Sequence, residues 1–149
     1  YQIWFYRWSN KLHFNFIRIN TRNQFIVIIN FTNAQKRHCT AFIISDFINP
    51  GDMYQPLMIA SNRHEINAIQ IYDRHDAELP NVGLVKFHDA ESGQDLWIDT
   101  ALPSIRNHYA QTWRDNQLQL KQLFTRTGID NVSMRTDQDY VKALMQLFR

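Results

Sequence analysis

An aspartate at the end of an apolar run is the residue in this chain best placed for chemistry. Asp46 ends a run that begins at Ala41, and a turn at Pro50-Gly51 follows. An unbroken apolar run bounded by turn residues is typical of a strand buried on both faces of a parallel sheet. Ligands of such sheets bind outside the carboxyl ends of the strands. Asp46 therefore has the position and chemistry of a hard-cation ligand. The alternative from the same spacing is an aspartate that caps a helix or orders the turn.

A second group of ionisable residues follows the next predicted strand. The loop 73–80 contains three acids and a histidine, which could bind a metal or transfer protons. Their spacing is not that of a zinc site, and exposed acidic loops are common, so a solvated loop is the simpler prediction. The enzymatic alternative is a metal-dependent hydrolase that uses Asp46 with Asp73, His75 or Asp76.

The elements that position these residues follow an alternating strand and helix pattern. Strands are predicted at 40–46 and 66–72, joined by a helix at 54–63, which makes a βαβ unit with a right-handed crossover. A mostly parallel sheet flanked by helices is therefore expected. The other predicted elements are a β-hairpin of strands 83–88 and 94–99, a long helix at 104–127, a strand at 131–135 and a final helix.

Two helices carry apolar faces that predict burial. Along the long helix, a stripe at spacings of four and seven comprises Ile105, Tyr109, Trp113, Leu120 and Phe124. We expect Trp113 to be buried against the sheet, and Gly128 to end the helix in a left-handed conformation. Thr136 is the predicted cap of the final helix. The predicted buried face of that helix is Tyr140, Val141, Leu144, Met145 and Phe148.

Length, composition and the single cysteine limit the class of protein. A chain of 149 residues is most simply one domain with room for a core. Lone Cys39 excludes an internal disulfide and fits a reducing compartment, so a cytoplasmic location is expected. No apolar run is long enough to span a bilayer, and no phosphate-binding glycine loop or nucleophile elbow is present. The chain begins with Tyr1, which leaves room for upstream segments.

The start of the chain differs from the rest in charge and composition. Residues 1–45 hold six basic and no acidic residues, whereas the remainder holds ten basic and fourteen acidic ones. Residues 1–31 also lack Gly, Pro and Ala and are rich in residues with A/T-rich codons, which favours a shifted reading frame or a mis-joined start. The other interpretations are strands at 14–19 and 25–29, and, ranked last, a basic-aromatic surface for nucleic acid. The predicted division is therefore an atypical segment 1–31 followed by a domain at 32–149.

The order of motifs from about residue 33 to 149 resembles bacterial domain-of-unknown-function family 58. The resemblance lies in AFIISDF, in RHEINAIQIYDRHDAELPNVGLVKFHDAESGQDLWIDT and in TGIDNVSMRTDQDYVKALMQLFR. That family carries a von Willebrand factor A-like domain and is often encoded beside MoxR-type AAA+ ATPases. The resemblance implies a doubly wound α/β fold, a protein-binding or assembly role and a protein partner of the MoxR type.

This sequence departs from the family at the ion-binding loop. Such domains hold a divalent cation with an Asp-x-Ser-x-Ser loop, a separate Thr and a later Asp, and Asp46 matches only that last position. A hard cation needs about six oxygen ligands, so a weak, incomplete site is expected here, with Mg²⁺ binding in the full parent protein. Truncation would also expose the edge of strand 40–46. Residues 25–29 are predicted to cover that edge as a strand, within the chain or swapped between two self-associating copies.

Overall fold

The computed structural model describes residues 3–4, 14–18, 24–48, 53–88 and 93–147. A five-stranded sheet forms its centre, in the order β1-β2-β3-β4-β7. Strand β1 is antiparallel to β2, and every other neighbouring pair is parallel. The strands are β1 (Ile3–Trp4), β2 (Phe14–Arg18), β3 (Thr40–Ser45), β4 (Glu65–Tyr72) and β7 (Asp130–Arg135). The predicted α/β architecture with a mostly parallel sheet is therefore confirmed.

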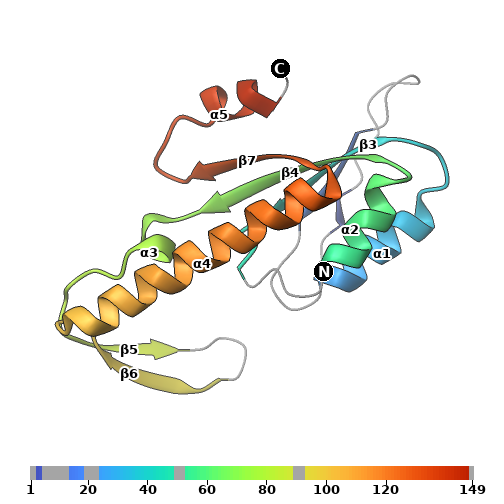
Figure 1. The fold of residues 1–149 in the computed structure, drawn as a ribbon. Coiled ribbons are helices and arrows are strands. Elements are labelled where there is room, and N and C mark those ends of the chain that lie inside the picture. The colour runs from blue at the N-terminus through green and yellow to red at the C-terminus, as the bar shows by residue number, and fades with distance from the viewer. Residues whose placement is uncertain (1–2, 5–13, 19–23, 49–52, 89–92, 148–149) are drawn as a thin grey trace.

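Helices cover both faces of the sheet (Figure 1). The helices are α1 (Gln24–Ala34), α2 (Tyr54–Ser61), α3 (Arg74–Ala77), α4 (Pro103–Thr127) and α5 (Tyr140–Leu147). Three of them, α1, α2 and α4, share one apolar cluster with the sheet, and α5 packs on a second cluster. The parallel strands follow one another across the sheet in chain order. Because their crossover connections have the same hand, the connecting helices lie on one face of the sheet. The reversal of strand order that defines a doubly wound sheet does not occur among the described strands.

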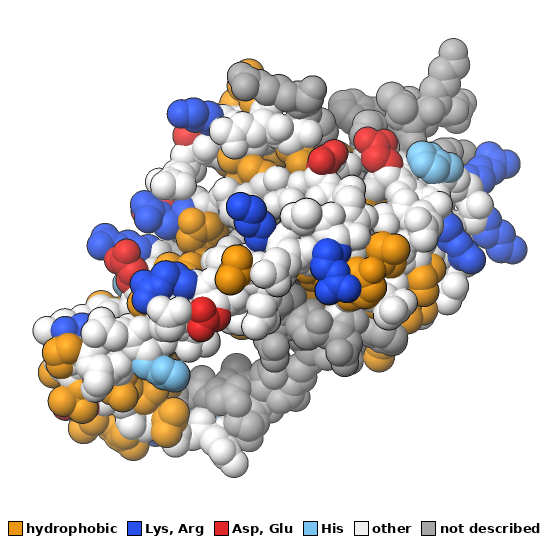
Figure 2. All heavy atoms as spheres, in the orientation of Figure 1, with side chains coloured by type: hydrophobic (Ala, Val, Ile, Leu, Met, Phe, Trp, Pro, Cys, Tyr) orange, Lys and Arg blue, Asp and Glu red, His pale blue; other side chains and the backbone are white. Residues whose placement is uncertain are grey.

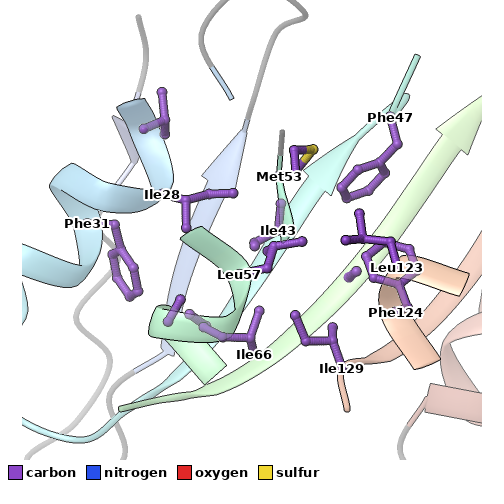
Figure 3. Packing of buried hydrophobic residues seen from close by; sticks show 14 of the residues in the cluster. Ile28, Phe31, Ile43, Phe47, Met53, Leu57, Ile66, Leu123, Phe124 and Ile129 are labelled. Carbon is purple, nitrogen blue, oxygen red and sulfur yellow. The ribbon is translucent and has the colours of Figure 1, made fainter. Parts of the chain in front are cut away.

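The main core lies between the sheet and the three helices α1, α2 and α4. Ile28 and Phe31 of α1, Ile43 of β3 and Leu57 of α2 are all at most 1% exposed. Figure 3 shows these side chains converging between the helices and the strands, with Phe124 of α4 at the far side. Burial of a large apolar side chain contributes about 1.5–3 kcal/mol, so this cluster is a main source of stability.

Residues 25–29 form part of a helix, so the prediction of a strand there is wrong. Helix α1 contains all five residues, and its buried positions Val27, Ile28, Phe31 and Thr32 follow helical spacing. The edge of β3 is instead covered by β2, which pairs with it in parallel from Phe14 to Arg18. The expected cover exists, but a different segment supplies it.

Helix α4 runs from Pro103 to Thr127, and the φ of 65° at its cap residue Gly128 confirms the predicted left-handed termination. Only the second half of the helix is buried in the core, through residues such as Leu120 and Phe124. The first half extends past the sheet and lies near the hairpin (Figure 1). Trp113 is consequently half-buried rather than buried, and its ring packs at a tilt of 41° against that of Tyr72, with the centroids 5.1 Å apart.

Helix α5 packs on the sheet through a face that shares only Leu144 with the predicted one. Ala143, Leu144 and Leu147 pack on the second cluster. The residues predicted to be buried but found exposed are Tyr140, Val141 and Met145, while Phe148 lies outside the described residues. None of the described helices is long and apolar enough to cross a membrane.

Candidate functional site

Asp46 lies at the carboxyl end of β3, as predicted, and orders the turn that follows. Its Oδ1 accepts the backbone N–H of Ile48 at 3.2 Å, and the preceding Ser45 Oγ accepts the N–H of Phe47 at 3.1 Å. Phe47 has a φ of 51°, and its buried ring meets Phe124 edge-to-face at 5.4 Å. That contact fixes the tight turn. The Asp46 side chain is only half-buried, so its carboxylate reaches the surface.

Gln70 joins the Asp46 turn to the rest of the sheet. This side chain is 1% exposed, and its Nε2 donates to the Asp46 carbonyl at 3.0 Å. Its Oε1 accepts a hydrogen bond from Ser133 Oγ at 2.8 Å. Because both ends of a buried amide are satisfied, the bridge holds β3, β4 and β7 in one arrangement. Sequence reasoning missed Gln70, although a polar residue inside the apolar run Ile69-Gln70-Ile71 was the available signal.

A second cluster of hydrogen-bonded residues surrounds Asp73 at the end of β4, and we name it the Asp73 centre. It caps helix α3, because one carboxylate oxygen accepts the N–H of His75 at 2.9 Å and lies 2.8 Å from its Nδ1. Its own N–H donates to the carboxylate of Asp76 at 2.6 Å, which completes a capping box. The hydrogen bond from the His75 backbone, followed by those from its ring and from Thr136, lowers the pKa of Asp73. The predicted solvated loop is thus exposed but ordered.

Two residues that are distant in the sequence also form hydrogen bonds with the Asp73 centre. Thr136, at the end of β7, donates its hydroxyl to Asp73 Oδ2 at 3.0 Å. The predicted role of Thr136 as a helix cap is therefore wrong, and Asp139 accepts the N–H of Val141 at the start of α5. Tyr109 of α4 donates to the carbonyl of His75 at 2.9 Å, and burial, followed by the charge of Asp76, raises the pKa of its phenol.

The described residues do not fit a tight magnesium site. No group of three or more His, Cys, Asp or Glu side chains in this part of the chain is placed to hold a metal. Asp46 follows Ser45, and Ser45 pairs with Gln70 of the neighbouring strand. Gln70 in turn precedes Asp73 by three positions. The structure therefore does not join Asp46 with Asp73, His75 and Asp76 in one ligand set. One carboxylate cannot supply the six or so oxygens that a hard cation needs.

Comparison with known proteins places this chain in a family. The family model described as "Protein of unknown function DUF58" matches residues 25–119. Uncharacterized proteins of Mycobacterium tuberculosis (strain ATCC 25618 / H37Rv) and Mycobacterium bovis are each 34% identical over 123 residues, which is 81% of this chain and 38% of those proteins. An uncharacterized protein of Mycobacterium avium is 31% identical over 117 residues, 77% of this chain and 68% of that protein.

The chain spans less than two fifths of the length of the first of these relatives. No solved structure matches it. The family model covers more than half of the chain and includes the Asp46 turn, the Asp73 centre and the hairpin. It confirms the resemblance that the motifs indicated. The chain therefore belongs to the DUF58 family of proteins of unknown function.

Proposed function

We propose that this chain is a non-catalytic protein-interaction module of von Willebrand factor A-like type that acts with a MoxR-type AAA+ ATPase in the cytoplasm. The observation that carries the proposal is the rigid presentation of Asp46. Buried Gln70 holds its carbonyl, and the half-buried carboxylate stands at the edge of the sheet where parallel folds bind their ligands. A fixed surface carboxylate suits recognition, because little conformational entropy is lost on binding.

The bonding of Asp73 favours binding over acid–base catalysis. Its carboxylate accepts hydrogen bonds from His75 and Thr136, and these bonds lower its pKa. A carboxylate with a lowered pKa is a weaker general base near neutral pH. The bond from Thr136 also joins the carboxyl ends of β4 and β7, which gives the binding edge a defined shape.

A binding measurement with a matched pair of variants tests the proposal. The MoxR-type ATPase encoded nearest to this gene is purified and titrated onto the immobilised chain with Mg²⁺ and ATP present throughout. We expect Asp46→Ala to weaken binding at least tenfold, about 1.4 kcal/mol. Asp130→Ala is the control, because Asp130 is exposed at the amino end of β7. The amino ends of the parallel strands lie on the side of the sheet opposite to the carboxyl ends, where Asp46 stands. No binding, or equal losses in both variants, would contradict the proposal.

One contact supports the alternative of a metal-dependent hydrolase. The carboxylate of Asp73 lies 2.8 Å from Nδ1 of His75, which is how carboxylates orient catalytic or metal-binding imidazoles. The alternative predicts turnover of activated phosphodiester or ester substrates with Mg²⁺ or Mn²⁺, lost in His75→Asn and in Asp73→Asn, because Asp46 is not brought into this group of residues. Absence of turnover in the unaltered chain, together with binding of the ATPase, would favour the interaction module.

A further inference from the structure

Exposed basic residues gather where the chain enters strands β3 and β4. The three that follow helix α1 and the one that follows α2 are Lys36, Arg37, His38 and Arg63, and we name them the basic edge. Their two connections lie side by side, because the N–H of Glu65 donates to the carbonyl of Cys39 at 3.0 Å. Figure 2 shows Lys and Arg side chains beside a histidine at the right-hand end of the molecule, where Figure 1 places these two connections.

The two arginines of the basic edge differ from the other arginines in having no bonding partner. Among the residues that the structure describes, the guanidinium groups of Arg37 and Arg63 make no hydrogen bond, ion pair or ring contact. The other five arginines whose side chains are described bond to an oxygen atom or stack on a ring, and they are Arg74, Arg106, Arg114, Arg126 and Arg135. Lys86 of strand β5 (Leu84–His88) is likewise paired, at 2.7 Å, with Asp95 of β6 (Asp95–Asp99). Two planar guanidinium forks therefore remain open to a bidentate acceptor.

The surroundings of the basic edge do not neutralise it. Glu65 is the acid nearest to Arg63 in the sequence, but its carboxylate accepts the hydroxyl of Thr40 at 2.7 Å. The negative ends of helices α1 and α2 favour basic residues at these positions, yet they leave both guanidinium groups without an acceptor. Burial lowers the pKa of His64, and the charges of His38 and Arg63 lower it further, as expected beside a concentration of positive charge.

The size and the borders of the basic edge favour a short acidic segment of a protein over other polyanions. Its three permanent charges are fewer than the roughly six to ten phosphate contacts of a nucleic-acid site or the roughly four to eight cations of a site for acidic lipids. Exposed carboxylates of Glu65 and Asp130 stand beside it, at the amino ends of β4 and β7. They would repel a continuous row of phosphates. A peptide can place carboxylates on the cations and neutral residues against these two acids.

We propose that the basic edge binds a short acidic segment of a partner protein, whose carboxylates pair with Lys36, Arg37 and Arg63. Clusters of arginine are a recurring way of binding acidic motifs, because each guanidinium can hold both oxygens of one carboxylate. This inference is independent of the ATPase proposal, because Asp46 stands at the carboxyl end of β3 and the basic edge lies at the amino ends of the strands.

An NMR titration of the ¹⁵N-labelled chain with a peptide of about eight glutamates tests the proposal. At about 0.1 M salt the Debye length is about 10 Å, so distant charges have little effect. We expect saturable shifts of the amides around residues 35–39 and 62–65. Arg37→Glu combined with Arg63→Glu should raise the dissociation constant at least tenfold. The matched control is Arg114→Glu combined with Lys142→Glu, because both residues are exposed on other helices and the change in net charge is the same. It should change the constant less than about twofold.

Two further probes separate the acidic peptide from other anions. A thymidine oligonucleotide of about nine residues and vesicles that contain phosphatidylserine should both bind more weakly than the peptide, because phosphates meet Glu65 and Asp130. Tighter binding of either probe, lost in the Arg37 and Arg63 double variant, would overturn the proposal in favour of nucleic acid or of a membrane. It would also be overturned by equal effects of the two double variants, or by the absence of saturable peptide binding up to about 2 mM. Circular dichroism should show that both double variants retain the fold.

Discussion

The thiol of Cys39 lies 3.6 Å from Nδ1 of His64, and both side chains are buried at the amino ends of β3 and β4. The Phe31 ring packs on the imidazole with a centroid distance of 5.2 Å. Among the residues that the structure describes, Nε2 of His64 has no hydrogen-bond partner. Burial lowers the pKa of His64, and the neighbouring charges of His38 and Arg63 lower it further. Protonation of this imidazole therefore opposes folding.

The lowered pKa of His64 predicts that stability falls in mild acid. The unfolded chain takes up the proton near the ordinary pKa of about 6.5, and the folded chain does so only at lower pH. The stabilising contribution is therefore complete above about pH 6.5 and declines as pH falls below that value. Urea unfolding at several values between about pH 7.5 and 5 measures this slope.

Two glutamine variants test the assignment of that pH dependence. His64→Gln should flatten the slope of unfolding free energy against pH, because the titrating group is gone. His38→Gln is the control, since its ring is exposed 6.5 Å from that of His64, and it should leave most of the slope. Equal slopes in the unaltered chain and in His64→Gln would show that another group controls acid sensitivity.

The local sequence pattern was sufficient to predict those elements whose structure is determined by which of their faces is buried. The buried strand at 40–46, the strand at 66–72, the hairpin and the long helix were predicted within about two residues of their observed ends. Residues 25–29 were predicted as a strand because Ile and Val favour strands. They form a helix because the helical spacing of Val27, Ile28 and Phe31 allows all three side chains to be buried.

The candidate site depends on contacts that local sequence does not encode. Thr136 and Ser133 each bond to a residue 63 positions away, Asp73 and Gln70 respectively. A threonine before a helix pattern is ordinarily read as a cap, and only the pairing of β4 with β7 brings Thr136 to Asp73 instead. The position of Asp46 was predictable because a strand end is a local feature.

Magnesium should have almost no effect on the stability of this chain. Asp46 offers one carboxylate, so the dissociation constant should exceed ordinary millimolar Mg²⁺, and the stabilisation RT ln(1 + [L]/Kd) is then small. Thermal unfolding with about 5 mM Mg²⁺ or with EDTA should give melting temperatures within about 1 °C. A large increase that Asp46→Ala abolishes would instead reveal a complete ion site.

Substitutions along α4 should show that its two halves contribute differently to stability. Trp113→Ala should cost about 1–2 kcal/mol, because Trp113 is half-buried and its main aromatic contact is Tyr72. Leu120→Ala should cost about 2–5 kcal/mol, because Leu120 is 3% exposed in the main core. Chemical denaturation gives both values. A larger loss for Trp113 than for Leu120 would mean that the first half of the helix is the more tightly packed of the two.

The opening segment should be required for a cooperative fold, although its composition differs from the rest. Strand β2 pairs with β3 from Thr40 to Ile44, and α1 places Ile28 and Phe31 in the main core. Deleting residues 1–31 removes both and exposes an apolar strand edge that can pair with other chains. We expect the fragment 32–149 to aggregate or to lose cooperative unfolding. Deleting residues 1–23 removes β2 but keeps α1, so it should retain more helix by circular dichroism while still associating through β3. A soluble, monomeric fragment 32–149 that unfolds cooperatively would disprove this and would show that the opening segment is dispensable.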